Sequence, residues 1–115
     1  QWAGIAAIRE AGPDVRHMVE IFNKRRKLTI ERLRKIGFGV AVEPTGAFYV
    51  LANAKNFTDD SLKFAFELLE ETSVGVTPGI DFGRNAEGYV RFSYANSIDN
   101  ISEGMDRLEQ YLTSR

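Results

Sequence analysis

The residues best suited to chemistry lie between Val74 and Ala95, in the stretch VGVTPGIDFGRNAEGYVRFSYA. This pattern predicts two short strands joined by a glycine-rich loop, with a single cation, Arg91, in the middle of the second strand. Strand alternation puts Arg91 on one face with Tyr89, Ser93 and Ala95, and puts Val90, Phe92 and Tyr94 on the other. A guanidinium offers parallel N–H donors that fit a carboxylate. The alternative is an arginine that faces solvent or pairs with a neighbouring glutamate.

Composition excludes several other kinds of chemistry. Lys and Arg number 15 against 16 Asp and Glu, for a net charge of −1, so no nucleic-acid partner is expected. The absence of cysteine excludes disulfides, zinc–thiolate sites and thiol catalysis. One histidine, His17, cannot form a histidine metal cluster alone, and no metal site is expected.

Length and hydropathy bound the organisation of the chain. Its 115 residues, 43% of them hydrophobic, are enough for one domain with a modest core. No apolar run approaches the roughly 20 residues of a membrane helix, and no secretion signal is visible. A cytoplasmic protein without a membrane partner is therefore expected.

Hydrophobic periodicity positions the Arg91 strand within an α+β fold. The expected order is α-β-β-α-β-β-α, with a two-layer arrangement in which helices cover a mixed four-stranded sheet. A helix is expected at 15–36, closed by Gly37, and another runs from a cap at Thr58 to about residue 72. Ser97 caps the last helix. The expected strands are 38–42, 47–52, 74–77 and the Arg91 strand.

Three segments, in this order, resemble one known family. They are Pro44-Thr-Gly46-Ala47-Phe48-Tyr49, then Val74-Gly-Val76-Thr-Pro78-Gly79-Ile-Asp-Phe82-Gly83, then Gly88-Tyr89-Val-Arg91-Phe92-Ser93-Tyr94-Ala95. Each alone is a weak signal, but together they are specific. The chain resembles the C-terminal small domain of the class I/II, fold-type-I aminotransferases that depend on pyridoxal phosphate, the aspartate aminotransferase group.

The resemblance implies a role for three residues. Arg91 matches the family arginine that binds the α-carboxylate of the substrate, an amino acid or a 2-oxo acid. Gly79 and Phe82 match a loop that approaches the mouth of the active site. The implied reaction is amino-group transfer between an amino acid and a 2-oxo acid, in an enzyme that works as a homodimer.

The resemblance also implies that part of the site lies elsewhere. The family's catalytic lysine and its other pyridoxal phosphate ligands belong to an upstream large domain, and none of the five lysines here has the matching context. We therefore expect no cofactor-binding or catalytic residue in this chain, which would be inactive alone. Residues 1–12 are expected to be a remnant of the large-domain side, and 13–115 the small domain with the interdomain helix.

Two alternatives remain open on the residues alone. The chain could be a stand-alone, non-enzymatic α+β module that binds a carboxylate ligand or a partner. It could also serve another fold-type-I reaction, such as decarboxylation, lyase chemistry or acyl condensation, because one fold supports many activities.

Overall fold

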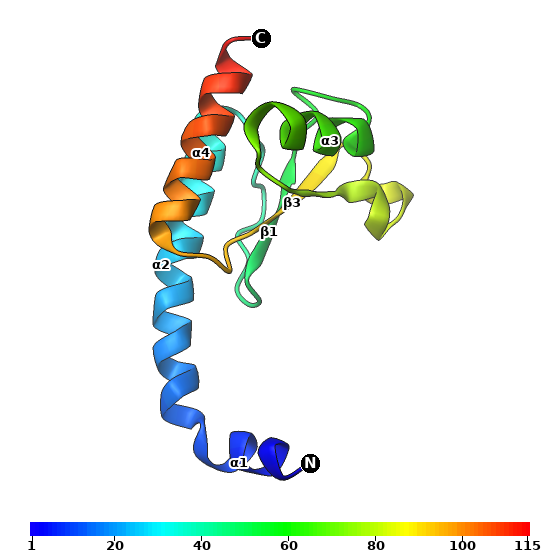
Figure 1. The fold of residues 1–115 in the computed structure, drawn as a ribbon. Helices are drawn as coiled ribbons and strands as arrows, with labels where there is room; N and C mark the ends of the chain where they lie inside the picture. Colours follow the sequence, from blue (N-terminus) through cyan, green and yellow to red (C-terminus); the bar gives the residue numbers. More distant parts are fainter.

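The computed structural model describes all residues from 1 to 115 and has the α+β architecture expected from the sequence. It contains four α-helices, three strands and two 3₁₀ helices (Figure 1). Their bounds are α1 Trp2–Glu10, α2 Gly12–Ile36, β1 Tyr49–Asn53, α3 Ser61–Thr72, β2 Thr77–Pro78, η1 Gly79–Phe82, η2 Arg84–Ala86, β3 Tyr89–Ser93 and α4 Ile98–Thr113.

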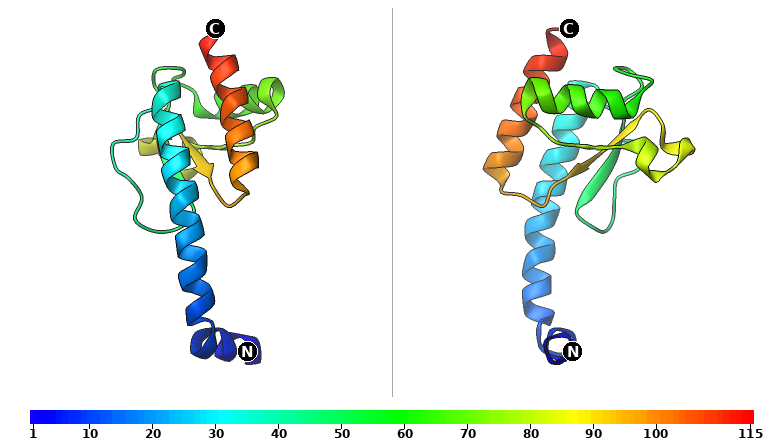
Figure 2. Two further views of the ribbon diagram at one scale, coloured as in Figure 1. Left: turned by 90° about the vertical axis from the view of Figure 1, so that its left-hand side faces the viewer. Right: turned by 45° about the vertical axis from the view of Figure 1, so that its right-hand side comes forward.

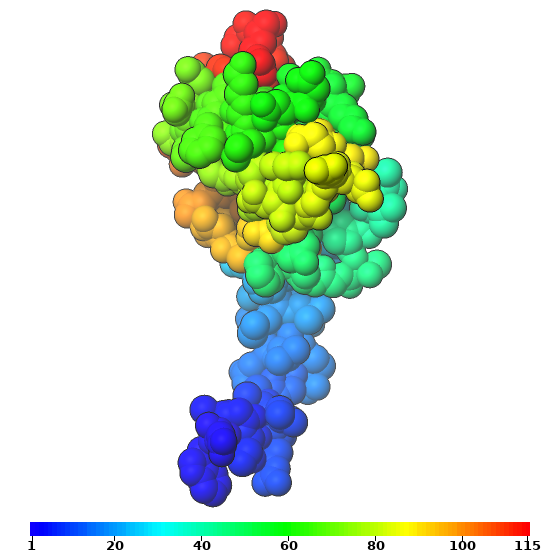
Figure 3. Space-filling model, turned by 90° about the vertical axis from the view of Figure 1, so that its right-hand side faces the viewer, coloured from blue at the N-terminus to red at the C-terminus, as the bar shows by residue number.

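The molecule has a packed body and a projecting stalk. The C-terminal half of α2 lies beside α4 in the body, whereas α1 and the first half of α2 extend away from it (Figures 1 and 2). The space-filling view shows the stalk standing clear of the rest (Figure 3). Apolar side chains of the stalk are exposed, with Trp2 87% and Ile8 88% accessible. Both residues therefore lack a partner within this chain.

The sheet differs from the expected one. It has three strands in the order β1-β3-β2, and both pairings are antiparallel. The expectation of a mixed four-stranded sheet was therefore wrong, and so was the exact element order. The Arg91 strand is the central one, where it pairs with a strand on each side.

The missing strand is the segment 38–42, which makes only an isolated bridge between Gly39 and Asn53. Beyond that bridge the backbone makes no further ladder pairing with the sheet, and a side chain of α2 contacts it. Arg34 donates a hydrogen bond to the carbonyl of Val40 at 3.1 Å and forms an ion pair with Glu43 at 2.8 Å. Contacts with the preceding helix thus accompany the loss of the strand that the composition of this segment favours.

One continuous core joins the sheet to α2, α3 and α4. The alternation expected for β3 is confirmed, because Val90 and Phe92 are buried while Tyr89 and Arg91 are only partly buried. The last helix also follows its predicted pattern. Its buried residues are Ile101, Met105, Leu108 and Leu112, and Ser97 caps it by accepting a hydrogen bond from the backbone of Asn100.

Two helix ends test the cap predictions. Gly37 closes α2 in the left-handed conformation at φ 115°, as expected. The N-cap of α3 is Asp60, whose carboxylate accepts from the backbone N–H of Lys63. The prediction of Thr58 was wrong, since its hydroxyl instead accepts from the backbone N–H of Asp60, one step earlier.

The structure contains no helix that combines the length and the apolar character needed to cross a membrane.

Candidate carboxylate-binding site

Arg91 occupies the centre of the sheet, on the face opposite the helices. It lies directly across from Leu51 on β1 and from Thr77 on β2. Its Nη2 donates a hydrogen bond to Thr77 Oγ1 at 3.2 Å. Because neighbouring strands hold its backbone on both sides, the position of the side chain base is fixed by the fold.

Two aromatic rings contact the Arg91 guanidinium. Its central carbon lies 5.0 Å from the ring centroid of Tyr49 and 5.1 Å from that of Phe82. A cation over the face of an aromatic ring is attracted by the ring quadrupole. Tyr49 comes from β1 and Phe82 from η1, so a strand and a loop converge on the same group.

No acidic side chain pairs with this cation. All seven ion pairs of the chain involve other residues, and the Nε of Arg91 is buried without a hydrogen-bond partner. A charged group with unused donors is costly unless an anion or water satisfies it. The arrangement is therefore suited to receive a carboxylate, and the paired-glutamate alternative does not apply.

Gly79 begins the loop that carries Phe82, and its lack of a side chain is required by packing. A Cβ there would lie 1.9 Å from the carbonyl oxygen of Ala86 and 2.5 Å from that of Tyr89. Both atoms belong to the backbone and cannot move aside cheaply. The absence of a Cβ therefore lets the start of the loop touch its own end, which folds 79–88 back beside β3.

The same loop is tied to the first turn of α3. Ser61 Oγ accepts a hydrogen bond from the backbone N–H of Ile80, and the backbone N–H of Ser61 donates to Glu87 Oε1 at 2.7 Å. Glu87 also accepts from the N–H of Gly88. These donors, Ser61 first, hold the pKa of Glu87 below its usual value. Both ends of the Phe82 loop are thus anchored to one helix terminus.

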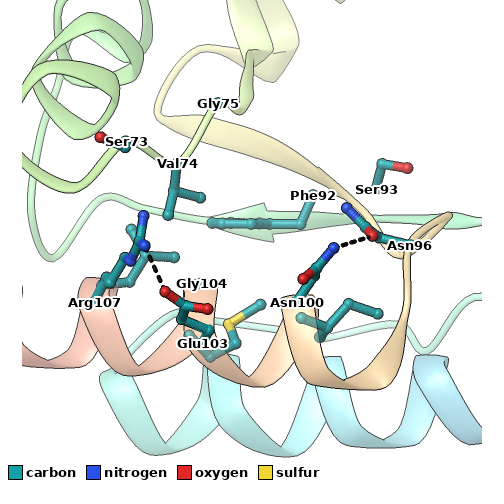
Figure 4. A pocket seen from close by; sticks show the side chains of 13 residues that line it. Ser73, Val74, Gly75, Phe92, Ser93, Asn96, Asn100, Glu103, Gly104 and Arg107 are labelled. Atoms are coloured by element: carbon teal, nitrogen blue, oxygen red, sulfur yellow. Dashed lines mark hydrogen bonds and ion pairs between the residues drawn. The ribbon is translucent and has the colours of Figure 1, made fainter.

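A hollow of about 350 Å³ lies apart from this cluster, between α4 and the segment that precedes β2 (Figure 4). Its polar side chains largely satisfy one another. Arg107 pairs with Glu103, and Asn100 donates to Asn96 (Figure 4). Because its single cation is already paired, this hollow is less suited to bind an anion than the face around Arg91.

No lysine of the chain is buried. Lys35 forms an ion pair with Glu109, and Lys55 lies over the ring of Tyr89. All five lysines, including Lys24, Lys27 and Lys63, are exposed, and none joins the Arg91 cluster. These exposed lysines do not form a pocket suited to pyridoxal phosphate, and the absence of a catalytic lysine from this chain stays a prediction.

Of the three residues singled out from the sequence, Arg91 and Phe82 lie in contact with each other. Gly79 lies at the base of the same loop. Sequence reasoning missed Tyr49, Thr77 and Glu87. The alternation of residues 47–52 could have put Tyr49 on the Arg91 face, but only the strand register puts Thr77 opposite Arg91.

Comparison with known proteins gives the family. The family description "Aminotransferase class I and II" matches residues 1–108. The chain belongs to this family.

Individual relatives agree. The chain is 44% identical over 114 residues to an aspartate aminotransferase of Pyrococcus horikoshii, covering 97% of this chain and 29% of that protein. It is 38% identical over 113 residues to a (5-formylfuran-3-yl)methyl phosphate transaminase of Methanocaldococcus jannaschii, covering 97% of this chain and 30% of that protein. The crystal structure of an aromatic aminotransferase from Pyrococcus horikoshii superposes with a TM-score of 0.88 at 37% identity, covering 93% of this chain and 28% of that one. The chain thus spans less than a third of the length of these relatives.

Proposed function

We propose that the full-length protein containing this chain transfers an amino group between an amino acid and a 2-oxo acid. In this proposal the present domain supplies Arg91, which binds the α-carboxylate of the substrate. The observation that carries the proposal is a cation with no acidic partner, held beside two aromatic rings on the face of the sheet opposite the helices.

The names of the relatives support recognition of a shared group. One relative is named for aspartate and another for aromatic substrates, although both match this domain. Amino acids with such different side chains have the α-amino and α-carboxylate groups in common. A domain that binds only the α-carboxylate can therefore occur in enzymes that act on different amino acids.

The free energy expected from a hydrogen bond between Arg91 and a carboxylate is large enough for this role. A hydrogen bond to a charged group contributes about 1.5–3 kcal/mol net, which corresponds to roughly 10- to 150-fold in an equilibrium constant. A guanidinium held by surrounding groups before binding loses less conformational freedom on association. Arg91 meets this condition through Thr77, Tyr49 and Phe82.

Pyridoxal phosphate would supply the amino-group chemistry, and the rest of the polypeptide would hold it. The contribution of this chain is limited to binding and orienting the substrate carboxylate. Gly79 shapes the loop, and Phe82 borders the carboxylate position. The exposed apolar residues of the stalk, such as Trp2 and Ile8, would contact the large domain of the same polypeptide. The family resemblance further supports a cytoplasmic homodimer.

Replacement of Arg91 by leucine in the full-length protein tests the proposal. We expect kcat/KM for L-aspartate, L-phenylalanine and L-alanine, with 2-oxoglutarate as acceptor, to fall at least about 10-fold for every active substrate. The matched control is Arg84→Leu, which removes an exposed, unpaired charge from η2 and should leave kcat/KM within about twofold. Unchanged kinetics in Arg91→Leu would refute the assigned role.

A further inference from the structure

The guanidinium of Arg91 makes one hydrogen bond within this chain, and its acceptor is Thr77. The two residues lie directly opposite each other in the β2–β3 register. Both side chains therefore point to the same face of the sheet. The strand register itself therefore places the hydroxyl beside the guanidinium.

The other contacts of the guanidinium are not directional in the same way. Attraction to the rings of Tyr49 and Phe82 depends on the height of the cation over each ring. This attraction depends little on how the planar guanidinium, a fork of N–H donors, is rotated within its own plane. A hydrogen bond, in contrast, weakens steeply when the angle at the donor changes. Thr77 is therefore the group that can fix the orientation of the fork.

Orientation matters because recognition of a carboxylate by arginine relies on parallel donors. An arginine side chain carries about 2 kcal/mol of rotamer entropy, and ordering it only on binding would weaken affinity. The hydroxyl of Thr77 occupies one donor at Nη2, while Nη1 makes no hydrogen bond in the chain. The remaining donors of the fork are thereby held ready for an anion.

We propose that Thr77 is a positioning residue for carboxylate recognition, acting through Arg91. The proposal rests on the carboxylate-binding role proposed above for Arg91. It extends that role to a second residue, which sets the affinity for the carboxylate group and not the rate of the chemical step.

The test uses the full-length protein loaded with pyridoxal phosphate, and compares Thr77→Val with Thr77→Ser. Valine keeps the branched shape and removes the hydroxyl, whereas serine keeps the hydroxyl. We expect Thr77→Val to raise KM for L-aspartate or L-phenylalanine about three- to tenfold, with kcat within about twofold. Thr77→Ser should restore KM to within about twofold of the wild type.

Binding of unreactive carboxylates gives a second readout that needs no turnover. Calorimetry with succinate and hydrocinnamate should show the same three- to tenfold loss of affinity in Thr77→Val and the same recovery in Thr77→Ser. If serine restores neither KM nor carboxylate affinity, the effect of Thr77→Val is a packing defect, and the positioning role is wrong.

A double replacement separates this inference from the proposed function. In an Arg91→Lys background, Thr77→Val should cause no further loss of affinity, because the oriented fork is already gone. If Arg91→Lys and Arg91→Leu both leave carboxylate affinity unchanged, the role of Arg91 fails and the inference fails with it. If the Arg91 variants lose affinity while Thr77→Val binds like the wild type, only the inference is overturned.

Discussion

Glu87 accepts a 2.7 Å hydrogen bond from the backbone N–H of Ser61, although the two residues are 26 positions apart. Ser61 is the first residue of α3, so the carboxylate lies at the positive end of the helix dipole. The loop that ends at Glu87 carries Phe82, which contacts Arg91. The N-terminus of α3 thus holds in place the loop that brings Phe82 to Arg91.

This contact predicts a pH-dependent contribution to stability. The pKa of Glu87 is lowered, so its contribution is fully present above the unfolded-state pKa and is lost as the pH falls through the lower folded-state pKa. We expect Glu87→Gln to unfold at lower urea concentration than the wild type at pH 7. The difference should shrink progressively below pH 4.5, the ordinary value for this group. A difference that stays constant down to pH 3 would contradict the assignment.

Gly79→Ala should be severely destabilising. The new Cβ would lie 1.9 Å from the backbone oxygen of Ala86, and backbone atoms on both sides would have to shift. We expect a loss of at least about 3 kcal/mol in the free energy of unfolding, measured by urea denaturation. Gly46→Ala is the matched control, because no atom lies within 4 Å of a Cβ at that position. Equal effects of the two replacements would disprove the close approach.

Ser73→Gly should stabilise the chain. Ser73 ends α3 in the left-handed conformation, with φ 58°, which glycine adopts without the steric cost of a side chain. We expect a gain of about 0.5–1 kcal/mol, seen as a higher melting temperature. Ser114→Gly is the control, since Ser114 ends α4 in the right-handed region and should give no gain there.

Leu108→Ala should cost about 2–5 kcal/mol in the free energy of unfolding, because Leu108 is fully buried in the core between α4 and the sheet. Ile8→Ala removes comparable apolar volume from the stalk, where Ile8 is 88% exposed. With both variants measured in this chain alone, without the large domain, that change should stay within about 0.5 kcal/mol. A large loss in Ile8→Ala would mean that the stalk packs against the body or against a second copy.

The helices and the position of Arg91 were predictable from the sequence because the signals are local. Apolar spacing, the glycine after Ile36 and the serine before Ile98 lie within the helices or next to them. Strand alternation likewise predicted the face of Arg91 correctly. These signals require no knowledge of what lies across the sheet.

Features that depend on distant partners were not predictable in the same way. The segment 38–42 has a strand-like composition, but Arg34 and Glu43 hold it to α2. Thr58 has the right residue type for a cap, yet Asp60 is better placed for the exposed N–H groups. The pairing of Thr77 with Arg91 follows from strand register, which composition does not determine.

The length of α2 has a mechanical consequence. It is a single helix of 25 residues, with one end packed in the body and the other free. At 1.5 Å per residue it spans about 37 Å. Because its C-terminal half is packed beside α4, only the first half, about 12 residues or roughly 18 Å, can move as a lever: bending it by about 10° would carry the free end through roughly 3 Å. Any body attached to the stalk would move relative to the sheet by at least that distance.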